Sequence, residues 1–192
     1  MTTVVVAEKP SVARDIARVL GVRQKGEGCL VGDGYVVTWA LGHLVEFSEP
    51  DEYGPPWNDS WSFAQLPMIP DPWKLRTAKK TAAQFQIVKK LINDAGTTEV
   101  ICATDAGREG ENIFRLIYEH ARCRKPVRRL WISSLTDEAI RDGFGQLISL
   151  RMASMVHEYV ILNAVKNLDP GLQKRPSYKD DGLDSSSLRS SE

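Results

Sequence analysis

Two short apolar runs that lead into acidic residues most constrain the fold of this chain. Residues 4–7 (Val-Val-Val-Ala) lead into Glu8, and residues 100–103 (Val-Ile-Cys-Ala) lead towards Asp105. A helical spacing of apolar residues follows each run, which is typical of an α/β fold with a mostly parallel sheet flanked by helices. Parallel strands end at the same edge of a sheet, so Glu8, Asp105 and Glu109 are expected to converge where such sheets bind ligands.

The other elements are predicted from local turn and capping signals. A helix should begin at Pro10 and end before Gly21, and Gly32-Asp33-Gly34 should turn a hairpin between two short strands. Thr136, followed by two acidic residues, should cap the last helix. Further strands are expected over residues 99–103 and 127–132, and further helices over residues 78–95 and 109–121.

The segment 45–76 interrupts this alternation of strands and helices. It contains six prolines, and the aromatic residues among them include Phe47, Trp57, Trp61 and Phe63. A segment so rich in proline is predicted to be mostly loop. Its aromatic side chains either pack a long insertion onto the domain, which is the commoner arrangement, or stack on nucleic-acid bases.

Several separated motifs resemble those of one known family, in the same order along the chain. They are Glu8-Lys9-Pro10-Ser11, residues 39–44 (Trp-Ala-Leu-Gly-His-Leu), residues 73–75 (Trp-Lys-Leu), residues 103–111 (Ala-Thr-Asp-Ala-Gly-Arg-Glu-Gly-Glu) and residues 130–136 (Leu-Trp-Ile-Ser-Ser-Leu-Thr). Together they resemble the TOPRIM domain of type IA DNA topoisomerases, closest to the topoisomerase III branch. The resemblance implies a Rossmann-like TOPRIM fold over residues 1–148, with an inserted hairpin and a long proline-rich loop.

The resemblance also implies a centre that cleaves and religates single-stranded DNA with Mg²⁺ and so changes DNA topology. Glu8 matches the acid that protonates the departing 3′ oxygen, and Lys9 would hold the scissile phosphate. Asp105, together with Glu8 and Glu109, would hold Mg²⁺.

Other residues in these motifs are candidates for supporting roles. Arg108 and His43 would contact nucleic-acid phosphates together with Lys9, although a histidine like His43 is more often a partly buried structural residue. Glu111, in the following helix, would contact the site residues and not the metal ion or the DNA directly. The usual family pattern is Asp-x-Asp, and Gly107 stands at the second acidic position. One carboxylate fewer implies a weaker or single metal site, since Mg²⁺ keeps several waters in most sites.

The nucleophile of the resembled enzymes is a tyrosine in a separate domain. The tyrosines here are Tyr35, Tyr53, Tyr118, Tyr159 and Tyr178, and none has the family's sequence context. The chain alone is therefore expected to be incomplete and inactive in DNA relaxation. Two alternatives stay open. One is a non-catalytic TOPRIM module that binds nucleic acid, and the other is a TOPRIM nuclease that uses water, against which Gly107 counts.

Composition restricts the remaining classes of function. The 25 basic and 25 acidic residues give no net charge, so a surface for nucleic acid must be local. A basic cluster over residues 122–129 fits a solvated loop and a phosphate-contacting patch equally well. No apolar run reaches the ~18 residues of a membrane span, and no secretory signal is evident, so we expect a cytoplasmic protein without membrane association. The three cysteines form no Cys-x-x-Cys pair, so neither a disulfide framework nor a zinc site is expected. The sequence also lacks a P-loop motif, so a nucleotide cofactor is not expected.

The last part of the chain differs from the rest. The resemblance fades from about Ser149, and residues 149–168 are expected to form a helical extension. Residues 169–192 are polar and serine-rich, which predicts a disordered tail. A resemblance that fades within a domain suggests a truncated or frame-altered gene product. The expected partner is single-stranded DNA, bound in the context of a full-length enzyme.

Overall fold

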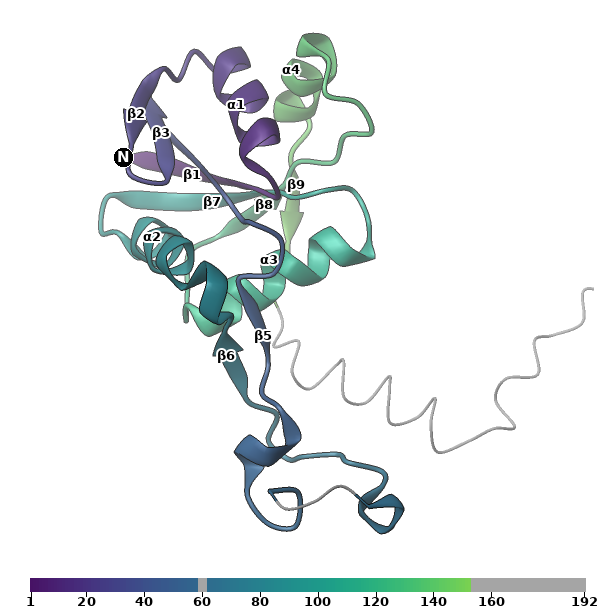
Figure 1. The fold of residues 1–192 in the computed structure, drawn as a ribbon. Coiled ribbons are helices and arrows are strands. Elements are labelled where there is room, and N and C mark those ends of the chain that lie inside the picture. The colour runs from purple at the N-terminus through teal and green to yellow at the C-terminus, as the bar shows by residue number, and fades with distance from the viewer. Residues whose placement is uncertain (59–61, 153–192) are drawn as a thin grey trace, which may run out of the picture. The chain divides into compact units, whose positions relative to one another are not determined.

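The computed structural model describes residues 1–58 and 62–152, which form a seven-stranded sheet with helices on both faces (Figure 1). The strands are β1 Thr2–Ala7, β2 Gln24–Gly26, β3 Cys29–Gly32, β4 Tyr35–Trp39, β7 Thr97–Ala103, β8 Val127–Arg129 and β9 Ile148–Leu150. Their order in the sheet is β2-β3-β4-β1-β7-β8-β9. The four central strands β4, β1, β7 and β8 are parallel, and antiparallel strands extend both edges. The predicted α/β fold is confirmed.

Helices cover the two faces of the sheet in two pairs (Figure 1). They are α1 (Pro10–Val19) and α4 (Asp137–Gly145) on one face, and α2 (Ala82–Asn93) and α3 (Arg108–His120) on the other. Successive residues of β1 point to opposite layers, so Val4 and Val6 pack with α2 and α3, whereas Val5 and Ala7 pack with α1 and α4. Because both faces of β1 are buried over residues 4–7, this part of the strand is continuously apolar.

Several local signals act as predicted. Gly21 has φ +75° just after α1, and Asp33 and Gly34 both have positive φ in the turn between β3 and β4. At the start of α4, Thr136 Oγ1 accepts a hydrogen bond from the Ala139 amide at 3.3 Å. The expected helix C-cap, hairpin turn and helix N-cap are therefore present.

Strands β8 and β9, at one edge of the sheet, differ from the prediction. The strand predicted over residues 127–132 ends at Arg129, although the Leu130 amide still donates a hydrogen bond to the Cys102 carbonyl at 2.9 Å. The short edge strand β9 was not predicted, and it pairs antiparallel with β8. The domain limits at residues 148 and 168 stay predictions. The tail beyond residue 168, and residues 153–168 of the expected helical extension, lie outside the described residues.

An arm within the proline-rich segment runs away from the sheet (Figure 1). Its base is an antiparallel pair, β5 (Val45–Phe47) with β6 (Leu75–Thr77). Three 3-10 turns lie along or beside it: η1 Pro50–Tyr53, η2 Phe63–Gln65 and η3 Lys79–Thr81. The side chain of Arg76 binds three carboxylates near the base of the arm, those of Glu46 at 2.9 Å, Glu49 at 3.0 Å and Glu52 at 2.6 Å.

The aromatic side chains of the arm pack partly against one another. Phe47 meets Trp73 edge to face at 5.4 Å between ring centroids, and Tyr53 meets Trp57 at 6.2 Å. Phe47 also packs against the core below the sheet, whereas Phe63 is 94% exposed. Of these aromatic side chains, Phe47 at the base of the insertion therefore packs onto the domain and Phe63 does not.

The described residues belong to one compact unit, Met1–Val156. Its helices are too short or too polar to span a membrane, as far as the described part of the chain goes.

Candidate active site

Glu8, Lys9 and Asp105 lie together at the carboxyl edge of the sheet. β1 and β7 are adjacent parallel strands with Ala7 opposite Ala103, so the residues that follow the two strands are neighbours. Lys9 Nζ is 3.3 Å from Glu8 Oε1 and 3.2 Å from Asp105 Oδ2. The Asp105 amide donates a hydrogen bond to Glu8 Oε2 at 3.1 Å. The structure thus brings together two of the three carboxylates singled out in the sequence.

The three side chains differ in their exposure to solvent. Glu8 is buried, with 8% of its surface exposed, whereas the side chains of Lys9 and Asp105 are more than half exposed. The hydrogen bond to Asp105, and then the one to Glu8, raises the pKa of Lys9 above its ordinary value, so its ammonium stays charged. Two carboxylates around one ammonium leave the centre with an excess of negative charge. Such a centre suits a divalent cation with oxygen ligands.

Glu109 and His43 form a separate pair beside this centre. The carboxylate of Glu109, in the first turn of α3, is 80% exposed, and its Oε1 is 3.9 Å from His43 Nε2. Among the described residues, no three His, Cys, Asp or Glu side chains are grouped to hold a metal ion. Glu109 is therefore not gathered with Glu8 and Asp105, and its role as a ligand stays a prediction. The phosphate contacts of His43 and of Arg108, which is exposed at the start of α3, also stay predictions.

The loop that carries Asp105 lies directly against α3 at Gly110. A Cβ atom at Gly110 would lie 2.3 Å from the Asp105 carbonyl oxygen and 2.9 Å from its nitrogen, so a larger residue would displace this loop. Thr104 Oγ1 also donates to the Gly110 carbonyl at 2.8 Å. Gly107, in contrast, is extended, and a Cβ atom there would meet nothing within 4 Å. The second position of the usual Asp-x-Asp pattern thus has room for a carboxylate.

Arg129 is a buried cation behind the centre, with only 2% of its surface exposed. Its Nη1 donates to the Cys102 carbonyl at 3.2 Å and to the Thr104 carbonyl at 2.8 Å, and its Nη2 donates to the Asp105 carbonyl at 2.7 Å. Assigning Arg129 to a solvated or phosphate-contacting cluster is therefore wrong. On β8, Arg129 points to the same side of the sheet as buried Val127, whereas Arg128 between them is more exposed. This alternation of side chains along a strand is the sequence signal that could have marked Arg129 as buried.

Glu111 joins Arg129 in a network of charges. Its Oε1 accepts a hydrogen bond from Arg115 Nε at 2.6 Å, and its Oε2 lies 3.5 Å from Arg129 Nε. The Arg129 guanidinium also lies over the ring of Trp131, 5.4 Å from the ring centroid. Glu111 thus contacts the arginine that binds the Asp105 loop, and its supporting role in the site stays a prediction.

The tyrosines of the described part of the chain make other contacts. Tyr35 packs edge to face on Phe144, Tyr53 lies in the arm, and the Tyr118 hydroxyl donates to the Lys125 carbonyl at 2.9 Å. The remaining two, which lie outside the described residues, are Tyr159 and Tyr178.

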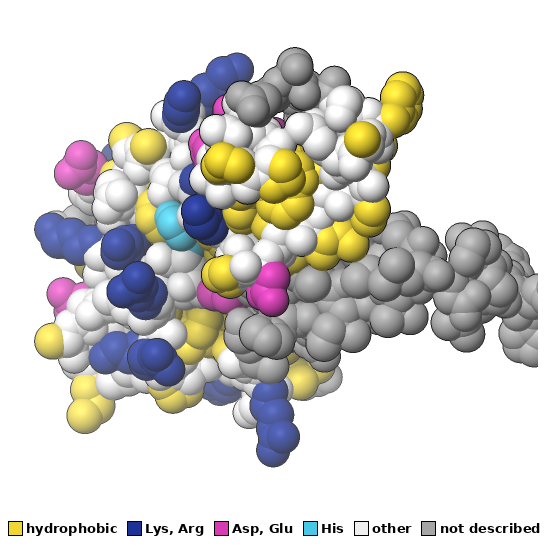
Figure 2. Space-filling model, turned by 90° about the horizontal axis from the view of Figure 1, so that it is seen from below, with side chains coloured by type: hydrophobic (Ala, Val, Ile, Leu, Met, Phe, Trp, Pro, Cys, Tyr) yellow, Lys and Arg dark blue, Asp and Glu magenta, His cyan; other side chains and the backbone are white. Residues whose placement is uncertain are grey.

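The zero net charge of the chain hides an uneven surface. Figure 2 shows a face on which Lys and Arg side chains are prominent on one side and hydrophobic side chains gather on the other. Three large hydrophobic side chains around β8, α4 and β9 are strongly exposed: Trp131, Leu135 and Ile148. Cations can meet phosphates, and exposed apolar groups can meet bases or another protein surface.

Comparison with known proteins assigns the chain to a family. The family model described as "Toprim domain" matches residues 3–135. A DNA topoisomerase 3 from Shouchella clausii is 57% identical over 143 residues, which cover 74% of this chain and 20% of that protein. A DNA topoisomerase 3 from Bacillus subtilis is 54% identical over 147 residues, which cover 77% of this chain and 20% of that protein.

The chain spans about a fifth of the length of these relatives. Full-length topoisomerase I from Thermotoga maritima has a similar fold, with a TM-score of 0.50 and 20% sequence identity over 78% of this chain and 21% of that chain. At this identity the structural match supports the fold alone. The family model covers more than half of the sequence, and the chain therefore belongs to the Toprim family.

Proposed function

We propose that this chain is the Toprim part of a type IA DNA topoisomerase of the topoisomerase 3 kind, which cleaves and religates single-stranded DNA. The observation that carries the proposal is the arrangement of Glu8, Lys9 and Asp105 within 3.3 Å of one another at the carboxyl edge of the sheet. The names of the relatives and the family motifs around these residues support the same function.

Lys9 would bind the scissile phosphate, because its ammonium is exposed and is a compact charge that a phosphate oxygen can reach from solvent. Glu8 would donate a proton to the 3′ oxygen as the phosphodiester breaks, and would take that proton back when the strand is resealed. The hydrogen bond from the Asp105 amide holds the Glu8 carboxylate in one orientation for this transfer.

Glu8 and Asp105 fit a Mg²⁺ ion. Both carboxylates already contact one cation, the Lys9 ammonium, and Mg²⁺ is commonly held by one or two carboxylates with several waters. When bound, the ion would supply positive charge against the charge that develops on the phosphate. Arg129 holds the backbone of Asp105 for this role, and Gly110, which has no side chain, leaves room for it. Glu109 is a candidate for a further ligand.

The attacking group would come from outside this centre. Type IA enzymes use a tyrosine, and the described tyrosines make the other contacts given above. This chain would therefore contribute the acid, the phosphate contact and the metal carboxylates. Arg108 and His43 would add phosphate contacts beside them.

Metal binding by wild type and by Asp105→Ala tests the site. We expect Mn²⁺, used as a paramagnetic substitute for Mg²⁺, to bind wild type and to bind the variant much more weakly. Asp142→Ala, which removes an exposed carboxylate on α4, is the matched control and should bind like wild type. Equal binding by all three proteins would contradict the assignment of Asp105.

Incubation with labelled single-stranded DNA and Mg²⁺ tests the class of function. The proposal expects metal-dependent binding that Lys9→Ala weakens, without cleavage. Hydrolysis of the strand would instead identify a nuclease. Metal-independent binding that Lys9→Ala and Glu8→Gln leave unchanged would identify a non-catalytic binding module.

A further inference from the structure

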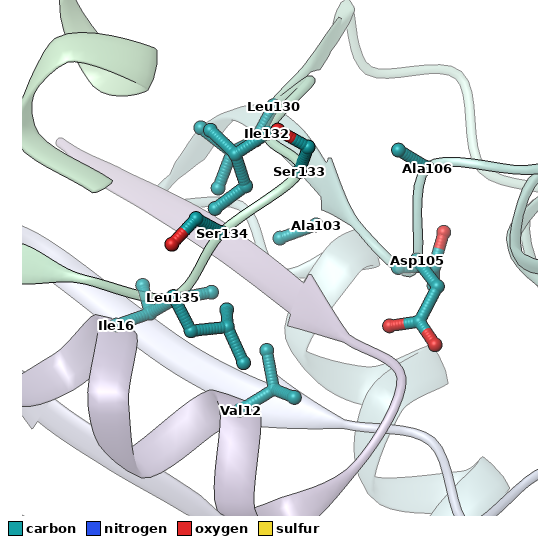
Figure 3. A pocket seen from close by; sticks show the side chains of 11 residues that line it. Val12, Ile16, Ala103, Asp105, Ala106, Leu130, Ile132, Ser133, Ser134 and Leu135 are labelled. Carbon is teal, nitrogen blue, oxygen red and sulfur yellow. The ribbon is translucent and has the colours of Figure 1, made fainter. Parts of the chain in front are cut away.

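A cavity of about 410 Å³ opens beside Asp105 at the carboxyl ends of β7 and β8 (Figure 3). Its volume lies within the range of about 300–1,000 Å³ that is usual for small-molecule sites. Three parts of the chain line it: helix α1, residues 103–106 at the end of β7, and, between β8 and α4, residues 130 and 132–135. The cavity therefore lies at the edge where open α/β sheets bind their ligands.

The wall of this cavity is mostly aliphatic and carries a few polar groups. Val12 and Ile16 of α1 are buried and lie near Leu135, whereas Asp105 stands on the opposite side (Figure 3). Leu135 is 44% exposed, so this part of the wall is open to an incoming group. Ser134 also lines the cavity and brings a hydroxyl group, which both donates and accepts hydrogen bonds.

This combination of groups fits a nucleobase. A base has two flat apolar faces, which aliphatic side chains can cover, and an edge of donors and acceptors, which hydroxyl groups can satisfy. An anionic group would be disfavoured inside, because Asp105, with its carboxylate, is the only charged residue among the described residues that line the cavity. A ligand that carries both a base and a phosphate should thus place the base in the cavity and the phosphate outside it.

We propose that this cavity is a nucleoside subsite for the nucleotide whose phosphate Lys9 holds. The inference rests on the proposed function. Lys9 Nζ is 3.2 Å from the Asp105 carboxylate, and Asp105 lines the cavity, so the phosphate contact and the cavity adjoin each other. One sugar joins the base and the phosphate of a nucleotide, which brings a base into reach of the cavity when its phosphate lies at Lys9.

A protein side chain is the competing occupant, because the exposed part of Leu135 is apolar. The continuity with Lys9 favours the nucleoside, since a side chain alone would leave that ammonium without a phosphate. The two occupants make different demands on the cavity. A nucleotide needs both the base and the phosphate contact, whereas a protein side chain needs only the apolar wall.

Methyl NMR of the 192-residue chain with Mg²⁺ tests the inference with three millimolar probes. They are deoxyadenosine monophosphate, deoxyribose 5-phosphate without a base, and N-acetyl-leucinamide as a substitute for a protein side chain. We expect the nucleotide to shift the methyl signals of Ile16 and Leu135 together with the amide of Lys9. The sugar phosphate should shift the Lys9 amide alone.

Two exposed aliphatic residues provide a matched pair of variants. Leu135→Ala removes part of the cavity wall and should weaken nucleotide binding by about fivefold, a fraction of the stacking and contact energy of one base. Ile148→Ala removes a side chain of similar exposure that does not line the cavity, and should leave binding unchanged. Ser134→Phe places a ring in the cavity and should abolish the methyl shifts while the sugar phosphate still shifts Lys9.

Each other outcome separates this inference from the proposed function. If both phosphates shift Lys9 and the nucleotide leaves the methyl signals unmoved, the nucleoside subsite is wrong and the phosphate site stands. If N-acetyl-leucinamide shifts the methyl signals and the nucleotide does not, a protein side chain is the occupant and the inference is overturned. If the nucleotide shifts the methyl signals without Lys9, the base site is supported and the phosphate site under the proposed function is contradicted.

Discussion

Arg129 Nη2 donates a hydrogen bond to the Asp105 carbonyl at 2.7 Å, so a buried cation holds the backbone of an exposed acidic residue. Burying a guanidinium is costly unless its donors are satisfied and its charge is balanced. Here the carbonyls of Cys102 and Thr104 accept further hydrogen bonds, and Glu111 supplies a negative charge. The position of Asp105 is thereby tied to the interior of the sheet as well as to its own loop.

We expect Arg129→Leu to lower the free energy of unfolding by about 3 kcal/mol. The carbonyls of Thr104 and Asp105 would lose their donor, and the partly buried Glu111 would lose a partner. Arg128→Leu is the neighbouring control, because the side chain of Arg128 is 40% exposed and pairs with the carboxylate of Glu99 on β7. It should cost less than about 1 kcal/mol. Urea denaturation measures both, and equal losses would contradict a special role for the buried arginine.

Two glycines that follow Asp105 should respond differently to replacement by alanine. Gly110→Ala should destabilise the protein by about 2 kcal/mol, because its Cβ would overlap the Asp105 carbonyl, although alanine normally favours a helix. Gly107→Ala should change stability by less than about 0.5 kcal/mol, because its backbone is extended and its surroundings are open. Thermal unfolding compares the two variants. A neutral Gly110→Ala would show that the loop yields easily.

Gly107→Asp should tighten metal binding. The extended backbone and the open space at Gly107 accept a carboxylate that would restore the usual Asp-x-Asp pair. A gain of roughly tenfold in Mn²⁺ affinity, about 1.4 kcal/mol, is expected from one additional oxygen ligand. Isothermal titration measures the affinity, with Gly107→Asn as a control of similar size and no charge. Unchanged affinity in Gly107→Asp would mean that this position does not face the ion.

The stability of the protein should fall below about pH 6.5 because of His120. The centroid of its ring lies 5.1 Å from the ring centroid of Phe85, and its Nε2 is 3.1 Å from Thr77 Oγ1. Burial, followed by repulsion from Lys89 and Arg122, lowers the pKa of His120 from its ordinary value of 6.5. The unfolded chain then takes up the proton first. The contribution to stability is full above the unfolded pKa and is lost as the pH falls through the folded pKa.

Urea denaturation above and below this pH checks the effect. His120→Gln should reduce the loss of stability on acidification, whereas His43→Gln, which changes an exposed histidine, should leave it as in wild type. The same pH dependence in all three proteins would assign it to other groups.

Purified protein of 192 residues should not relax negatively supercoiled plasmid with Mg²⁺. Relaxation through a covalent intermediate needs an activated nucleophile beside the acid, and the described tyrosines make other contacts. A plasmid assay, followed by a search for protein linked to a DNA end, checks this. Relaxation that is abolished by replacing one of the five tyrosines would identify a nucleophile in this chain.

The fold class and much of its local structure are readable from the sequence. The apolar runs of β1 and β7 indicate buried parallel strands, and Gly21 and Thr136 mark helix ends because only certain residues satisfy those backbone positions. The convergence of Glu8 with Asp105 follows from the same reasoning, since parallel strands place their carboxyl ends at one edge. These features depend on periodicity and on local backbone chemistry, which the sequence contains directly.

Other features were decided by tertiary structure alone. The pairing of β5 with β6 joins residues that a long proline-rich segment separates, and no local pattern encodes that contact. Glu109 is near Asp105 in sequence, but the first turn of α3 directs it to His43. Arg129 belongs to a basic stretch in the sequence, and only the packing of β8 beside β7 makes it a buried cation. Which charges meet depends on the register of distant segments, and this register is set by how the whole core packs.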